Sequence, residues 1–182
     1  RRGNYRERIM VSPPLRARLS AITARIQLAA ESVNRNPAEI TIVAATKTFP
    51  LEIWKDAINE NLTCIGESRV SEAAEKAKTL PLRDKIELHL IGHLQSNKAR
   101  KALELFDVIQ TIDSIKLAKR INAICAEMGI EKRIFIQVNT GNDPAKHGFS
   151  INNAMDAIWE ISEMKHLICE GIMTIPPHGL PE

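Results

Sequence analysis

Hydrophobic residues recur along the chain in two alternating patterns, and each pattern is typical of one kind of element. An apolar spacing of three or four residues after Ser12 and Pro13 predicts an amphipathic helix, because serine caps free amides and proline is tolerated at the first helical position. The members of this stripe are Leu15, Leu19, Ile22, Ile26 and Val33. An apolar run without polar alternation follows at residues 40–46, and it predicts a strand buried on both faces of a parallel sheet.

The same alternation of strand and helix continues along the chain. Further strands are predicted at residues 62–65, 86–91, 108–112, 134–138 and 168–175, and helices at residues 51–58, 70–77, 97–105, 117–128 and 151–161. Six strands separated by helices are typical of an open doubly wound sheet or of a (β/α)8 TIM-type barrel. Since a closed barrel needs eight strands, the sequence predicts an α/β fold that is either an open sheet or a barrel incomplete at the C-terminus, with about six βα units.

Composition narrows the class of protein. The 182 residues are 44% hydrophobic and 26% charged, as in an ordinary globular domain, and no apolar run approaches the roughly 18 residues that cross a bilayer. Three cysteines are an odd number without a CxxC pair, which favours a reducing compartment and predicts a cytoplasmic protein. We therefore expect no membrane association.

The net charge of +3 is concentrated in the first ten residues, which hold four arginines and one glutamate. We expect residues 1–11 to form a basic, flexible arm and residues 12–182 to form one domain. The arm leaves nucleic-acid binding open as an alternative, but only 4% of residues are aromatic and the sole tyrosine is Tyr5. A stacking platform for bases is therefore not expected.

Polar residues follow each predicted strand, where functional groups of α/β folds collect. Lys47 comes directly after the first apolar run, and burial there would lower the pKa of its amine and suit it to attack a carbonyl carbon. The alternative is a lysine that extends from the sheet edge into water. His89 and His93 are four residues apart on a predicted strand rather than a helix, so no metal site is expected. Trp54 and Trp159 are expected to pack their helices against the sheet.

Several strand ends together match one known family. The matching stretches are IVAATKTFP (42–50), IGE (65–67), HLIGHLQSNK (89–98), FD (106–107) with DS (113–114), QVN (137–139), KHGF (146–149) and GIMTIPP (171–177). In this order they resemble the pyridoxal phosphate (PLP) homeostasis proteins, single-domain relatives of the barrel half of alanine racemase. IGHLQSNK is the most specific of these stretches.

The resemblance implies a (β/α)8 barrel in which Lys47 forms a Schiff base with PLP. It implies that Ser68, Asn139, Lys146 and Met173 contact the cofactor, and that His93 and Asn97 order the loop after the third strand. Ser68 stands where the family usually has asparagine, and Phe49 where many members have a second lysine. The family's last strands and their phosphate-binding groups have no counterpart before Glu182, so the chain corresponds to about the first three quarters of such a barrel.

The family is not known for turnover. The resemblance implies a monomeric protein that holds PLP and supplies it to apo-enzymes, without nucleic-acid partners. A PLP-dependent racemase is the main alternative, but in alanine racemases it needs a tyrosine base and a second β domain. A Schiff-base aldolase would place its lysine on a later strand.

Overall fold

The computed structural model describes residues 14–79 and 83–176, and the chain divides into two compact units, Arg1–Thr41 and Ile42–Glu182. In the first unit, helix α1 (Leu15–Ser32) is followed by a 3-10 turn, η1 (Pro37–Glu39), whose preceding Asn36 side chain accepts a hydrogen bond from the Ala38 amide. The predicted cap at Ser12 and Pro13 and the predicted arm at residues 1–11 lie outside the described residues. The expectation of one domain over residues 12–182 stays a prediction.

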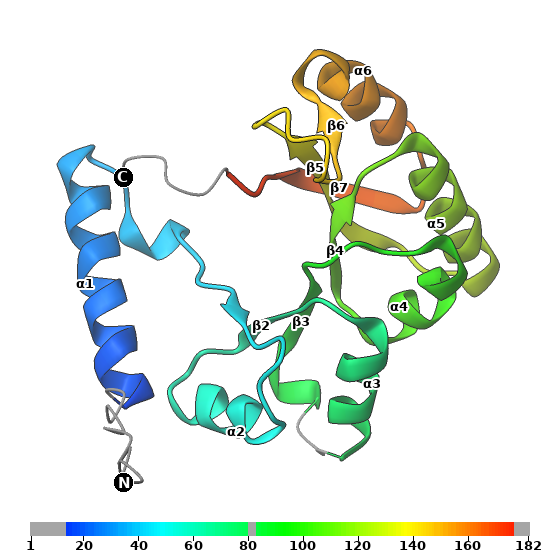
Figure 1. The fold of residues 1–182 in the computed structure, drawn as a ribbon. Coiled ribbons are helices and arrows are strands. Elements are labelled where there is room, and N and C mark those ends of the chain that lie inside the picture. Colours follow the sequence, from blue (N-terminus) through cyan, green and yellow to red (C-terminus); the bar gives the residue numbers. More distant parts are fainter. Residues whose placement is uncertain (1–13, 80–82, 177–182) are drawn as a thin grey trace, which may run out of the picture. The chain divides into compact units, whose positions relative to one another are not determined.

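The second unit is built on a parallel sheet (Figure 1). Its strands are β1 (Ala44–Ala45), β2 (Cys64–Glu67), β3 (Glu87–Leu90), β4 (Val108–Ile112), β5 (Lys132–Asn139), β6 (Phe149–Ser150) and β7 (Leu167–Met173). Strands β1 to β5 are neighbours in chain order, and β5 also pairs with β7 along most of its length and with β6 at its carboxyl end. Because every pair is parallel, the carboxyl ends of the strands meet at one edge.

A helix follows nearly every strand. These helices are α2 (Glu52–Asn59), α3 (Val70–Thr79), α4 (Ala99–Leu105), α5 (Ile115–Met128) and α6 (Ile151–Ser162), with 3-10 turns η2 (Arg83–Lys85) and η3 (Ser96–Lys98). Helices α3 to α6 lie on the outer side of the curved sheet (Figure 1). The Ser114 side chain caps α5, and Gly129 ends it in the left-handed conformation at φ 66°, which a glycine adopts without strain.

The core lies between the sheet and these helices. Aliphatic residues of β2 to β5 and apolar residues of the helices form one buried cluster, which includes Trp54, Ile65, Leu88, Ile109, Leu117, Ile121, Ile134 and Ile161. The predicted packing of Trp54 is confirmed, since it is fully buried. The same prediction for Trp159 is wrong: with Ile151 and Met155 it lies on the exposed side of α6, and it is 67% exposed. Among the described residues, no helix is long and apolar enough to cross a bilayer.

The first predicted strand needs correction. The run at residues 40–46 is not buried on both faces, because Ile42, Val43 and Ala44 are only half-buried and Ala45 is exposed. The reason is topological: within the part of the chain that the structure describes, β1 pairs with β2 alone, over two residues, and so is an edge strand. The short strand β6 escaped prediction because two residues carry no periodic signal.

Candidate functional site

The polar loops that follow the strands lie at the carboxyl edge of the sheet, where α/β folds place their ligands. Lys47 is in the turn directly after β1, and it is exposed. The prediction that Lys47 is buried is therefore wrong, because β1 is an edge strand and ends at Ala45, before the lysine. The turn has a distinct shape, because Thr48 has a φ of 67° and donates its amide hydrogen to Glu72 Oε1 at 3.0 Å.

Beneath this turn lies a buried polar cluster made of Thr46, Trp54, Glu67 and Lys76, which we term the Glu67 cluster. The carboxylate oxygen Oε1 of Glu67 accepts hydrogen bonds from the Thr46 hydroxyl at 2.7 Å, from Lys76 Nζ at 2.7 Å and from Trp54 Nε1 at 3.2 Å. Lys76 Nζ also donates to the Thr46 carbonyl at 3.0 Å. The cluster joins the end of β1 to β2, α2 and α3.

The charges of the Glu67 cluster depend on each other. Glu67 is completely buried and Lys76 is 7% exposed, so neither charge is stabilised by much solvent. Lys76 also pairs with Glu72 at 3.3 Å. Desolvation acts in the opposite direction, but the hydrogen bond from the Thr48 amide and the pairing with Lys76 lower the pKa of Glu72 below its usual value. Both carboxylates that pair with Lys76 thus accept a hydrogen bond from the Lys47 turn, Glu67 from Thr46 before the lysine and Glu72 from Thr48 after it.

Ser68 lies at the end of β2, against the loop that follows β3. A Cβ atom built on Gly92 would lie 2.2 Å from the Ser68 carbonyl oxygen and 2.7 Å from its Cα. Only glycine allows this approach of the two backbones. Ser68, which the resemblance predicts to contact the cofactor, can occupy this position only because Gly92 has no side chain.

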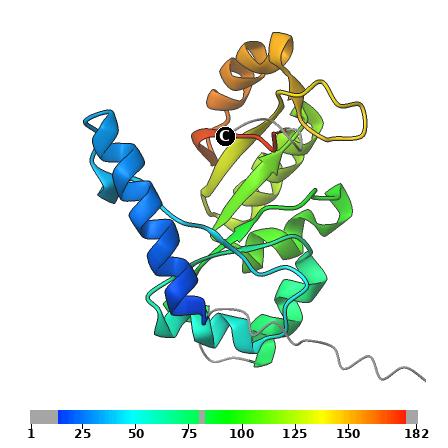
Figure 2. The same cartoon turned by 60° about the vertical axis from the view of Figure 1, so that its left-hand side comes forward.

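Two further predicted site residues are Asn139, at the end of β5, and Lys146, in the loop after it, which projects from the sheet edge (Figure 2). The Asn139 side-chain amide donates to the Asp143 carbonyl at 2.8 Å and to the Lys146 carbonyl at 3.3 Å, and its Oδ1 accepts from the Asp143 amide at 3.2 Å. Lys146 Nζ donates to the Pro176 carbonyl at 3.2 Å. Asn139 therefore shapes the loop on which Lys146 lies.

Met173 ends β7, in register with Gln137 of β5. Gln137 is a residue that the sequence did not single out. Its Nε2 donates to the His147 carbonyl at 3.1 Å, and its Oε1 is buried without a hydrogen-bond partner in the described part of the chain. Sequence analysis could have identified Gln137 as a polar residue within the apolar run of β5.

The structure thus places Lys47, Ser68, Asn139 and Met173 at the carboxyl ends of β1, β2, β5 and β7. His93 lies in the loop after β3, where its Nδ1 is 2.8 Å from Asp113 Oδ2, and Asn97 lies in η3. All these residues belong to the same edge of the sheet, which is the arrangement that the sequence predicted.

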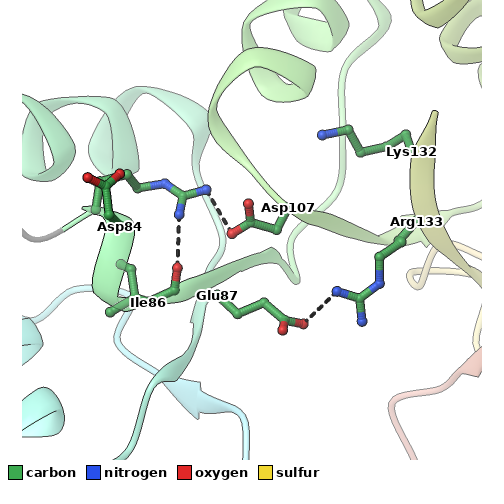
Figure 3. A pocket seen from close by; sticks show the side chains of 7 residues that line it. Asp84, Ile86, Glu87, Asp107, Lys132 and Arg133 are labelled. Carbon is green, nitrogen blue, oxygen red and sulfur yellow. Dashed lines mark hydrogen bonds and ion pairs between the residues drawn. The ribbon is translucent and has the colours of Figure 1, made fainter. Parts of the chain in front are cut away.

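A charged cavity of about 640 Å³ lies at the opposite edge, at the amino ends of β3 to β5 (Figure 3). Its charges compensate one another: Arg83 pairs with Asp107 at 2.7 Å and Arg133 pairs with Glu87 at 3.1 Å. Lys132 donates to two carbonyl oxygens of the α4 region, and burial lowers the pKa of its amine. These satisfied pairs stabilise the end of the sheet opposite to the one where such folds bind ligands.

Cys64 lies near this cavity and is expected to be unreactive. Burial first, and then the charge of Glu87, raise the pKa of its thiol to about 11. The reactive thiolate is therefore scarce at about pH 8. We expect iodoacetamide to label Cys64 more slowly in the native protein than in denaturant by at least about tenfold, as measured by peptide mass spectrometry. Equal rates in the two states would contradict the burial of this thiol.

Sequence comparisons define the family. The family described as "Alanine racemase, N-terminal domain" matches residues 17–179. The pyridoxal phosphate homeostasis protein of Pasteurella multocida is 34% identical over 163 residues, covering 87% of this chain and 68% of that protein. The protein of the same name from Escherichia coli K12 is 31% identical over 160 residues, with coverage of 87% and 68%. The chain thus spans about two thirds of the length of these relatives.

Solved structures agree with this result. PipY of Synechococcus elongatus, determined without PLP, superposes with a TM-score of 0.75 at 33% identity, over 86% of this chain and 73% of PipY. PipY with PLP bound gives a TM-score of 0.71 at 31% identity, with coverage of 85% and 72%. An alanine racemase of Clostridium difficile shares the fold alone, with a TM-score of 0.64 at 18% identity, over 74% of this chain and 35% of the racemase. The chain belongs to the pyridoxal phosphate homeostasis protein family, and its α/β fold is that of the alanine racemase N-terminal barrel domain.

Proposed function

We propose that this chain binds PLP as a Schiff base on Lys47 and takes part in PLP homeostasis without a turnover reaction of its own. The observation that carries the proposal is the position of Lys47: its amine is exposed at the carboxyl edge of the sheet, on a turn fixed by the Glu67 cluster. PipY, of the same family and fold, has been solved with PLP bound.

The chemistry needs little from the protein. The neutral amine of Lys47 attacks the aldehyde carbon, a C=N bond forms, and the aldehyde oxygen leaves as water. Hydrolysis reverses the reaction. Because the Lys47 side chain is exposed, both the incoming cofactor and the water that releases it can reach the site. Such a site is suited to hold PLP and to release it to apo-enzymes.

The other edge residues offer contacts that suit PLP. Ser68 presents a hydroxyl, Met173 an apolar thioether, and Lys146 a cation that would favour an anionic group. Oε1 of Gln137, which has no hydrogen-bond partner among residues 14–79 and 83–176, is a buried acceptor on the strand beside Met173. We propose Ser68, Asn139, Lys146 and Met173 as the residues that, with Lys47, hold the cofactor.

A racemase-like activity has less support. Racemisation through both faces of a substrate needs a second base besides the lysine, and alanine racemases use a tyrosine. The sole tyrosine here is Tyr5, which lies outside the described residues. The chain's three cysteines are unpaired, which supports our proposal that it works in the reducing cytoplasm. We propose separately that it works as a monomer.

The test is the visible absorption spectrum of the purified protein with added PLP, followed by borohydride reduction and peptide mass mapping. We expect a Schiff-base band and a reduced adduct on Lys47, and we expect both to be lost in Lys47→Ala. Lys55→Ala, which removes an exposed lysine of α2, is the matched control and should retain both.

An adduct on another lysine, or an unchanged band in a folded Lys47→Ala variant, would overturn the assignment. Circular dichroism of each variant verifies that the comparison is made between folded proteins. Chiral chromatography of alanine after incubation with the loaded protein tests the second function, and sustained racemisation would replace the carrier proposal.

A further inference from the structure

We propose that His93, Asp113 and His147, which we term the His93 triad, bind a divalent transition-metal cation of the Zn²⁺ class. Asp113 Oδ2 lies 2.8 Å from His93 Nδ1 and 3.7 Å from His147 Nδ1. The potential ligand atoms of the three side chains all lie within 4.8 Å of one another. This site is separate from the PLP proposal and involves none of the residues assigned to the cofactor.

These separations suit one cation. Zinc bonds of about 2.0–2.1 Å to nitrogen and oxygen in tetrahedral geometry place the ligand atoms about 3.3–3.5 Å apart. The two observed distances lie on either side of this value, so side-chain rotations, chiefly of the exposed His147, would complete the site. Two imidazoles with one carboxylate favour Zn²⁺ and similar metals over Mg²⁺ and Ca²⁺, which prefer all-oxygen ligands.

The two imidazole rings form a close pair in the metal-free arrangement. Their centroids are 3.8 Å apart and their planes differ by 10°, so they stack nearly face to face. Aromatic rings prefer offset or edge-on pairs with centroids about 4.5–7 Å apart. Both Nδ1 atoms also approach the same carboxylate oxygen. Since the lone pair of an imidazole nitrogen lies in the plane of its ring, one cation reaches both Nδ1 atoms only when the half-exposed His147 ring turns out of this stack.

The three ligands come from three separate loops, each held by the fold. Asp113 precedes the capping residue Ser114 of α5, and its side chain is 10% exposed. The loop of His93 is held where Thr111 Oγ1 donates to the Gly92 carbonyl at 2.8 Å, and the His147 carbonyl accepts from Gln137. The histidine side chains are 41% and 56% exposed, which leaves a path for the cation and room for water ligands.

The sequence did not indicate this site, since the only spacing it offered for His93 was with His89, on a predicted strand, and no metal site was expected there. The structure places His89 inside β3, where its Nε2 lies 3.1 Å from Cys64 Sγ and 2.8 Å from Glu87 Oε1. This second group could also hold a metal ion, but His89 and Cys64 are buried. The two groups share no residue, so substitutions distinguish them.

The experiment is a titration of the metal-free whole chain with zinc sulfate against a competing chromophoric chelator, without PLP, because PLP itself binds metals. We expect one equivalent of Zn²⁺ to bind, and we expect His93→Ala and His147→Ala each to weaken binding by at least about tenfold. His166→Ala removes a histidine outside the triad, and Cys64→Ser removes a ligand of the second group; both should bind as the wild type does.

Replacing Zn²⁺ with Co²⁺ gives a spectroscopic readout of the ligands, and the visible Co²⁺ bands should be lost in His147→Ala. His147 lies in an exposed loop, so this variant decides the result even where His93→Ala fails to fold. Binding that survives both histidine substitutions, or that Cys64→Ser abolishes, overturns the proposal. Lys47→Ala should retain Zn²⁺ affinity, so the failure of one proposal is distinguishable from failure of the other.

Discussion

Replacing Lys76 with methionine is expected to lower the free energy of unfolding by about 3–5 kcal/mol, the usual result of breaking a buried ion pair. Lys76 is the cation that neutralises the fully buried Glu67, with 2.7 Å between Nζ and Oε1. Methionine keeps most of the side-chain volume and removes the charge. The carboxylate of Glu67 would then be buried without a counter-ion and would have to be protonated or exposed to water.

Chemical denaturation of wild type and variant measures this effect. Lys78→Met is the matched control, because Lys78 is also on α3 and pairs with Glu75 at 3.1 Å, but its side chain is 70% exposed. Exposed pairs contribute at most about 1 kcal/mol. If Lys76→Met and Lys78→Met have the same stability, the Glu67 cluster does not stabilise the fold as we argue.

Replacing Gly92 with alanine is expected to cost about 1–3 kcal/mol, because the added methyl group overlaps backbone rather than a flexible side chain. The new Cβ would lie 2.2 Å from the Ser68 carbonyl oxygen, so the loops after β2 and β3 must move apart. Since Ser68 moves with its loop, we also expect weaker PLP binding under the proposed function.

Gly171→Ala provides the control for this change. A Cβ atom there would meet the ring of Phe135 at 3.4–3.5 Å, which is ordinary contact. Denaturant midpoints should therefore fall for Gly92→Ala and stay close to wild type for Gly171→Ala. A stable Gly92→Ala variant would show that the two loops are free to separate, against the tight approach in the structure.

The sheet and its helices were largely predictable because their signals are local. The apolar run at residues 108–112 coincides with β4, and the helix predicted at residues 117–128 does end at Gly129. The edge position of β1 was not predictable in this way, since the apolar residues before Lys47 look the same in a central strand and in an edge strand. As a result, the sequence predicted a buried Lys47, whereas in the structure Lys47 is exposed and the nearby Lys76 is buried.

The candidate site was only partly predictable, because its most specific contacts join residues that are distant in sequence. Lys76 lies in an alanine-rich helix and looks like a surface lysine until Glu67 of β2 is placed beside it. His147 likewise becomes a candidate metal ligand only when the fold brings it close to His93 and Asp113. The resemblance to a family identified the strand-end residues as a set. The structure then showed which side chains contact them, such as Lys76 at Glu67.

The two-residue pairing of β1 with β2 has a consequence for local stability. Backbone hydrogen bonds along β5 hold it on both sides, whereas β1 has few of them to resist fluctuation. What keeps the Lys47 turn in place is mainly a set of side-chain bonds to Glu67 and Glu72. The lysine therefore directly follows a strand of the sheet where local opening breaks few backbone hydrogen bonds.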